Sequence, residues 1–136
     1  MSSPLLDRLT QELGYPLLDI DGLDAFLGNN EYSVLFFTED PKRYPETNDV
    51  AVVLPELVKA FDGRFTPAVI ERGAEKTLQT RYGFKVWPAL VFLRGNAYLG
   101  TITKIQDWSV YLERVGTLLN SEPSRPPGVG VPVVGG

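Results

Sequence analysis

Four carboxylates lie in or beside one loop-like segment of the chain: Glu39, Asp40, Glu46 and Asp49. Carboxylates accept paired hydrogen bonds from guanidinium groups, so this segment suits a ligand that carries arginine. The same residue type can ligate a hard metal ion or hydrolyse a substrate as a pair. The interleaved Lys42 and Arg43 argue against a metal, and a small domain without an evident deep pocket argues against hydrolysis. The sequence therefore predicts no metal and no cofactor.

Three of these four carboxylates also have a purely structural interpretation. Asp40 can initiate a turn at Pro41, and Glu46 and Asp49 can stabilise the positive end of a following helix. Lys42 and Arg43 would then neutralise the carboxylates locally, which weakens the case for an anionic site.

The residue types that most often carry chemistry are absent, because the chain has no Cys and no His among 136 residues. Without Cys there are no disulfides, thiol redox reactions or thiolate metal sites. Without His the usual general base near neutral pH is missing, as is the usual ligand of transition metals. We therefore predict that the protein is not an enzyme.

Composition places the chain among small globular proteins, since 136 residues make about one domain and 43 % of them are apolar. Residues 1–62 carry 12 acidic and 4 basic side chains, whereas residues 63–136 carry 5 and 9. The acidic half argues against nucleic acid and favours a basic partner, although an ordinary solvated surface explains the same balance.

No apolar run approaches the roughly 18 residues of a membrane span, and the N-terminus lacks the apolar core of a secretory signal. We expect no membrane insertion and a cytoplasmic location.

Hydrophobic patterning predicts alternating strands and helices. Strands are expected at 16–20, 32–37, 65–71, 89–94 and 98–102. Helices are expected at 3–13, 22–28, 50–61, 74–83 and 108–119. Helices between strands imply parallel pairs with right-handed crossovers, whereas the last two strands form an antiparallel hairpin. The predicted class is α/β, with a central mixed sheet flanked by helices on both faces.

Finer assignments accompany these elements. The inward stripe of the first helix comprises Leu5, Leu6, Leu9 and Leu13, and Asp21 caps the second helix. Pro55 lies inside the third helix, whose apolar period continues across it. Asp107 begins the last helix, and Trp108 belongs to the core.

One domain is expected over residues 1–120, with the helix 3–13 as an N-terminal addition. Residues 121–136 are rich in Pro and Gly and show no helical period, so a flexible tail is expected there.

Three features resemble thioredoxins: the strand "VLFF" (34–37), Pro55 as a helix-kinking proline, and Trp87-Pro88 within "FKVWPALVFLRG" as a cis-proline turn. The resemblance implies a thioredoxin-like fold. Their Cys-x-x-Cys motif would fall on 47–50, where neither cysteine is present, so redox activity is not implied.

A closer resemblance covers about residues 5–120. The segments "DPKRYPETND" (40–49), "YGFKVWPALVF" (82–92) and "GNAYLGTITKIQDW" (95–108) are similar to the HyaE/HupG family of hydrogenase-expression proteins, which are thioredoxin-like without the redox cysteines. This resemblance implies a chaperone for maturation of an uptake [NiFe] hydrogenase. It also implies the partners, which are the small subunit and its twin-arginine signal peptide.

In such a fold, backbone groups beside a cis-proline can pair with an extended peptide, and no thiol is needed. The predicted peptide-binding residues are Glu39, Asp40, Tyr44, Glu46, Asp49, Trp87 and Pro88. The carboxylates would receive the two arginines, and the other three would supply apolar and stacking contacts. Trp87 has a core position as its alternative.

Two other hypotheses stay open at this point. In the first, the protein is a scaffold or assembly subunit that uses a helix face or the tail, with the loop idle. In the second, it is an enzyme that uses carboxylates alone.

Overall fold

A mixed sheet lies at the centre of the computed structural model, which describes residues 3–127. Within that range the strand order is β1-β3-β2-β4-β5. The strands are β1 (Leu17–Leu18), β2 (Tyr32–Phe37), β3 (Thr66–Ile70), β4 (Ala89–Arg94) and β5 (Ala97–Thr103). β3 pairs in parallel with β1 and β2, whereas β4 pairs antiparallel with β2 and β5. The predicted mixed sheet is confirmed.

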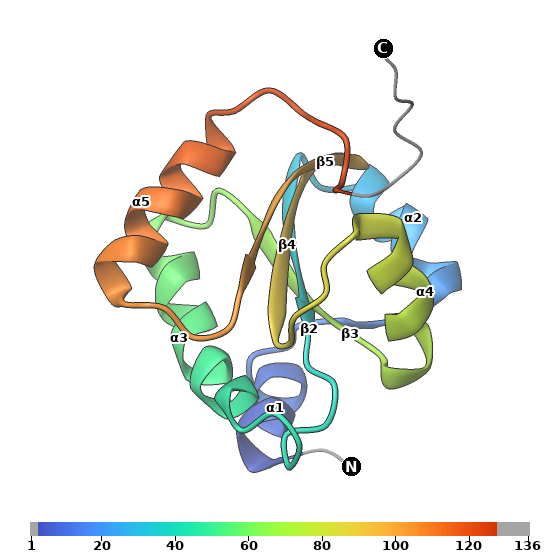
Figure 1. Cartoon of the computed structure of the whole chain (residues 1–136), viewed down its shortest axis with the longest axis vertical. Coiled ribbons are helices and arrows are strands. Elements are labelled where there is room, and N and C mark those ends of the chain that lie inside the picture. Colours follow the sequence, from blue (N-terminus) through green and yellow to red (C-terminus); the bar gives the residue numbers. More distant parts are fainter. Residues whose placement is uncertain (1–2, 128–136) are drawn as a thin grey trace.

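Helices cover both faces of this sheet (Figure 1). On one face lie α3 (Glu46–Ala60) and α5 (Trp108–Leu119), and on the other lie α2 (Ile20–Gly28) and α4 (Arg72–Tyr82). A short helix α1 (Pro4–Asp7) continues into a π-helical segment (Arg8–Glu12), and α1 lies against α3. The α/β class with helices on both faces is confirmed.

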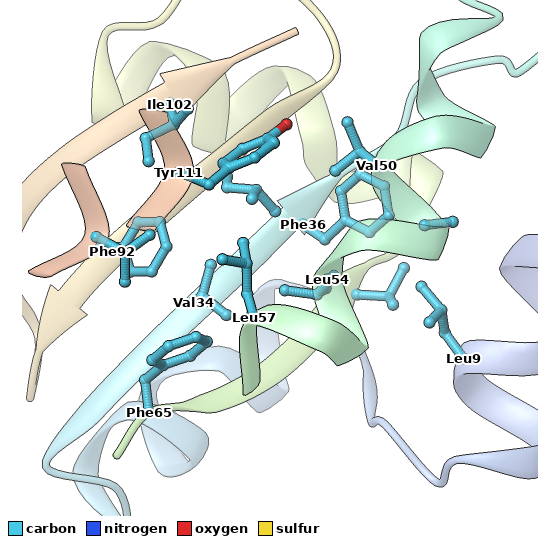
Figure 2. Close-up of a cluster of buried hydrophobic side chains, with 14 of the residues drawn as sticks. Leu9, Val34, Phe36, Val50, Leu54, Leu57, Phe65, Phe92, Ile102 and Tyr111 are labelled. Atoms are coloured by element: carbon cyan, nitrogen blue, oxygen red, sulfur yellow. The ribbon is translucent and has the colours of Figure 1, made fainter. Parts of the chain in front are cut away.

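Successive side chains of the central strand β2 point to opposite faces of the sheet, and helices cover both faces. The strand is therefore buried on both sides. Val34 and Phe36 join the cluster under α3 and α5, which Figure 2 shows, while Leu35 and Phe37 join the cluster under α2 and α4. Burying one such phenylalanine contributes about 2–3 kcal/mol. This strand therefore anchors the end of the sheet from which the next loop leaves.

Helix α3 turns its predicted apolar stripe inward. Val50, Leu54 and Leu57 are buried, and Figure 2 shows them facing β2. The helix continues across Pro55. Packing of the stripe therefore outweighs the roughly 3 kcal/mol that an interior proline costs a helix.

The first helix differs from the prediction. Of the predicted inward stripe, Leu6 and Leu9 are buried, but Leu5 and Leu13 are exposed. The π-helical segment accounts for Leu13, because it turns by a smaller angle per residue and carries Leu13 off the line of an α-helical stripe.

Two other assignments are wrong in detail. Helix α2 begins at Ile20, and its cap is Asp19, whose Oδ1 accepts the Gly22 N–H at 2.7 Å, rather than Asp21. Trp108 was expected in the core but is 43 % exposed. It occupies the first position of α5 and lines a small surface pocket together with Val52 and Val53 of α3.

The chain after α5 crosses back over the sheet. The Ser124 N–H donates to the Tyr98 carbonyl of β5 at 2.8 Å. The Pro127 carbonyl lies against Gly83, the left-handed residue that ends α4, so a side chain at Gly83 would collide with it. The rest of the predicted tail, 128–136, lies outside the described residues, and the domain boundary at 120 stays a prediction.

Candidate peptide-binding groove

The strand register brings three chain segments together at one end of the sheet. Phe37 at the end of β2 pairs with Ala89 at the start of β4, and Ala89 pairs with Thr103 at the end of β5. The loop after β2, the turn before β4 and the loop after β5 therefore meet (lower end in Figure 1). A groove of about 350 Å³ lies there. It is lined by Arg43, Tyr44, Pro45, Glu46, Lys85, Val86, Trp87 and Lys104.

One wall of the groove is the turn before β4, in which the Trp87–Pro88 peptide bond is cis, as predicted. Pro88 is buried, and its carbonyl accepts the Lys104 N–H at 2.8 Å. The Trp87 ring packs against Phe84 and Phe37, with centroid distances of 5.0 and 6.3 Å. Trp87 thus joins core packing on one side and lines the groove on the other.

The backbone of this wall has unused hydrogen-bonding groups. The N–H and C=O groups of Val86 and Trp87 form no hydrogen bond with any residue of the range 3–127. Val86 is also 43 % exposed. Such a segment can pair with an extended peptide, which adds main-chain hydrogen bonds while its side chains enter the groove.

The opposite wall is the turn that leads into α3. The Asp40 carbonyl accepts the N–H groups of Arg43 and Tyr44 at 2.9 and 2.8 Å, and the Asp40 Oδ1 accepts the Lys42 N–H at 3.0 Å. Asp40 therefore has the turn-forming role that was its structural alternative.

Glu46 connects the start of α3 to the loop after β5. Its Oε1 accepts the Ile105 N–H at 2.8 Å, and its Oε2 lies 3.7 Å from the Lys104 Nζ. Lys104 has a left-handed backbone with φ of 62°, which is uncommon outside glycine. The carboxylate of Glu46 is therefore already engaged by the protein itself.

The structure separates the seven predicted site residues. Tyr44, Glu46 and Trp87 line the groove, and Pro88 is buried behind it. Glu39, Asp40 and Asp49 do not line it.

Glu39 and Asp49 point to other parts of the molecule. The Glu39 Oε1 lies 3.3 Å from the Arg72 Nη2 of α4. Asp49 lies one turn along α3, where it and Glu46 are close enough to add to the effect of burial in raising the pKa of Tyr111. Their predicted role in peptide binding stays a prediction.

Three cations line the groove, and none of them was predicted as a site residue. On sequence, Arg43 was treated only as a charge that neutralises the nearby carboxylates, and Lys85 and Lys104 were not considered. Lys85 lies inside the quoted segment around the cis-proline, and Lys104 follows the last strand. Their proximity depends on the pairing of β4 with β5. Against these three cations the groove has one carboxylate, Glu46.

A buried carboxylate that was also missed holds the loop from beneath. Glu75 of α4 is 2 % exposed, and its Oε2 accepts the N–H groups of Thr38 and Glu39 at 2.8 and 3.0 Å. Burial raises its pKa to about 7, although the two backbone hydrogen bonds and Arg72 act in the opposite direction. The signal was present, since Glu75, Leu78 and Tyr82 share one helical stripe.

Two further observations concern chemistry and membranes. Within residues 3–127, no three side chains of His, Cys, Asp or Glu come together as ligands for a metal ion. In the same range, none of the helices has the length and apolar character of a membrane-spanning segment.

The fold and the groove define a thioredoxin-like protein without cysteines. A thioredoxin from Plasmodium falciparum has a similar structure, with a TM-score of 0.62 and 10 % identity over 75 % of this chain and 97 % of that chain. At this identity the likeness concerns the fold alone, and it confirms the predicted fold.

The chain belongs to the HyaE family, because the family model described as "Hydrogenase-1 expression protein HyaE" matches residues 5–111. The hydrogenase expression/formation protein HoxO of Azotobacter vinelandii is 56 % identical, with 90 % of this chain and 82 % of that protein covered. HupG of Rhizobium leguminosarum bv. viciae, with the same description, is 41 % identical over 90 % and 85 %.

A crystal structure of a putative HupG from Rhodopseudomonas palustris CGA009 is also similar. It has a TM-score of 0.56 and 44 % identity, over 76 % of this chain and 94 % of that chain. The resemblance to the HyaE/HupG family is confirmed by these comparisons.

Proposed function

We propose that the protein is a non-catalytic chaperone in the maturation of an uptake [NiFe] hydrogenase. Its client is the small subunit of that enzyme together with the twin-arginine signal peptide. The observation that carries this proposal is a groove with open backbone groups, in a chain without Cys or His that belongs to a family of hydrogenase expression proteins. Because a signal peptide is bound before export, we place the protein in the cytoplasm.

The peptide binds as an extended strand beside the turn before β4. Its main chain pairs with the N–H and C=O groups of Val86 and Trp87. Its apolar side chains contact Tyr44 and Trp87, which line opposite walls of the groove. This mode explains how a thioredoxin-like surface retains a function without sulfur.

The two arginines bind carboxylates outside the groove. Asp40 uses one oxygen for its own turn, and Asp49 forms no ion pair within the described residues, so both have acceptor capacity left. Glu39 shares its carboxylate with Arg72 and is less available. Pairs of this kind are exposed, so binding weakens as salt increases.

The residues at the start of α3 support the proposed absence of catalysis. Thr47 takes the first position of the redox motif, and its hydroxyl is buried and donates to the Thr38 carbonyl at 2.8 Å. A hydroxyl that is occupied in this way, without a neighbouring base, is not an activated nucleophile.

The test is titration of the complete chain with a synthetic twin-arginine signal peptide, followed by NMR. Shifts are expected at residues 39–49 and at Val86 and Trp87, and affinity should fall when both arginines are replaced by glutamine. A folded protein that binds neither this peptide nor the small-subunit precursor at low salt would refute the proposal.

A scaffold role is the second candidate, and an exposed apolar patch favours it. Val52 of α3 and Trp108 and Leu112 of α5 are 48, 43 and 37 % exposed. Patches of this kind often mark protein contacts. If Val52→Ser with Trp108→Ser abolishes co-purification with hydrogenase assembly proteins, and Lys85→Glu does not, the scaffold role is favoured.

A further inference from the structure

The groove carries an excess of positive charge that its own residues do not neutralise. Lys104 is paired with Glu46, whose carboxylate also accepts a backbone N–H. Lys85 forms no ion pair within residues 3–127. The Arg43 guanidinium lies 5.8 Å from the ring centroid of Tyr44 and also lacks a carboxylate partner there. Two cations therefore remain available to a ligand.

The backbone adds to this positive potential. Helix α3 starts at Glu46, which lines the groove, so the positive end of the helix lies at the groove wall. Its cap residue, Pro45, has no side chain that can accept a hydrogen bond from the first turn. The helix end supports the charge of Arg43 and Lys85, which are the groups that would contact a ligand.

The remaining lining is apolar or aromatic. Tyr44 and Trp87 are half-buried, and Val86 is exposed beside them. A ligand that matches all of these features is an extended segment with an acidic side chain next to a large apolar one. An arginine in the same place would meet like charges at short range, which disfavours it.

We propose that this groove binds an extended client segment that carries an aspartate or glutamate beside a large apolar residue, and that it rejects the arginine pair. This inference rests on the proposed function, because it takes the occupant to be the client peptide. It differs from the prediction made on sequence, in which carboxylates of the loop receive arginine at this surface. The arginines then bind outside the groove. The positive charge of the groove determines which residue of the peptide lies beside Arg43 and Lys85.

The experiment uses the complete chain and three capped synthetic peptides of about ten residues. The peptides are identical except that the residue before a central leucine is Asp, Asn or Arg. Trp108→Phe leaves Trp87 as the reporter of binding by fluorescence, since the protein has two tryptophans and Trp108 does not line the groove. The Asp peptide is expected to bind about threefold more tightly than the Asn peptide and about tenfold more tightly than the Arg peptide at low salt.

Charge reversal of the groove gives the decisive comparison. Lys85→Glu leaves two cations and two carboxylates in the groove, so it should abolish the preference for the Asp peptide, and Arg43→Glu should reduce that preference. The matched control is Lys76→Glu, which changes the net charge equally at an exposed site of α4 outside the groove and should preserve the order. Thermal melting of each variant checks that the fold is retained.

Failure of this inference and failure of the proposed function give different results. The inference is overturned if the Arg peptide binds as tightly as the Asp peptide, or if none of the three binds. It is also overturned if Lys85→Glu leaves affinity for the small-subunit precursor unchanged, although the proposed function then survives. Absence of precursor binding by the unmodified protein overturns the proposed function itself.

Discussion

Two grooves share the loop that follows β2, and they differ in charge. The first is the groove beside the cis-proline turn, where Arg43, Lys85 and Lys104 face Glu46. The second has about 330 Å³ and lies between the π-helical segment and the start of α4. Its charged residues are Asp7, Glu39, Glu71 and Arg72, and its apolar ones include Leu6, Leu17, Val69 and Ile70.

The comparison shows that an acidic loop does not make an acidic groove. Glu39 turns toward α4 and contacts Arg72, so its charge belongs to the second groove. Glu46 turns toward Lys104, so its charge is offset in the first. Whether an arginine of the client binds near the first or the second groove therefore depends on the direction in which each carboxylate points.

The largest expected effect comes from Glu75, which fixes the loop that both grooves share. Glu75→Ala leaves the buried N–H groups of Thr38 and Glu39 without partners, so the free energy of unfolding should fall by about 2–4 kcal/mol. Urea unfolding at pH 7 measures this loss. Glu75→Gln keeps an acceptor and should lose much less; equal losses for the two variants would contradict the assignment.

The same residue predicts a dependence on pH. The pKa of Glu75 is about 7 in the folded protein and near 4.5 when unfolded, so the folded state binds this proton more tightly. Its contribution to stability is largest below pH 4.5, falls as the pH rises to 7, and is constant above that.

The measurement is the unfolding free energy of Glu75→Gln and of the unmodified protein as a function of pH. Between pH 4.5 and 8 the difference between the two should change by up to about 3 kcal/mol, and the variant should become relatively more stable as the pH rises. A flat difference over this range would show that Glu75 keeps an ordinary pKa.

A smaller effect is expected from the single carboxylate of the first groove. Glu46→Gln keeps an acceptor for the Ile105 N–H and removes the partner of Lys104, so affinity for the Asp-containing peptide should rise about threefold. Glu39→Gln in the second groove is the control and should have no effect. Weaker binding of this peptide after Glu46→Gln would contradict the expected repulsion between Glu46 and the acidic side chain.

The smallest effect concerns the carboxylates outside the groove. Asp40→Asn and Asp49→Asn should each weaken binding of the twin-arginine peptide about twofold at low salt, because Asp49 is exposed and Asp40 is only half-buried. Isothermal titration calorimetry measures the loss, which should disappear at roughly 0.5 M salt. A loss that persists at high salt would point to a structural role for these residues.

Prediction from sequence succeeded where a local pattern dominates. The bounds of β2 and β4 agree with the predicted 32–37 and 89–94, because a short apolar run that contains Val and Phe and has polar flanks is typical of a strand buried on both faces. The end of the predicted helix 74–83 also agrees, since α4 ends at Tyr82 with Gly83 as its left-handed cap. The predicted core position of Trp108 was wrong, because helical periodicity assigns a residue to one face of a helix but does not show how far the surface packed against that face extends.

The residue types and their order determined the class of this protein: alternating strands and helices, a proline turn before β4, and no side chain for redox chemistry. Tertiary structure alone decided the character of the groove. The pairing of β4 with β2 and β5 brings Lys85, Lys104 and Arg43 together from distant parts of the chain. Electrostatic potential depends on distance in space, and for these residues that distance is set by strand register.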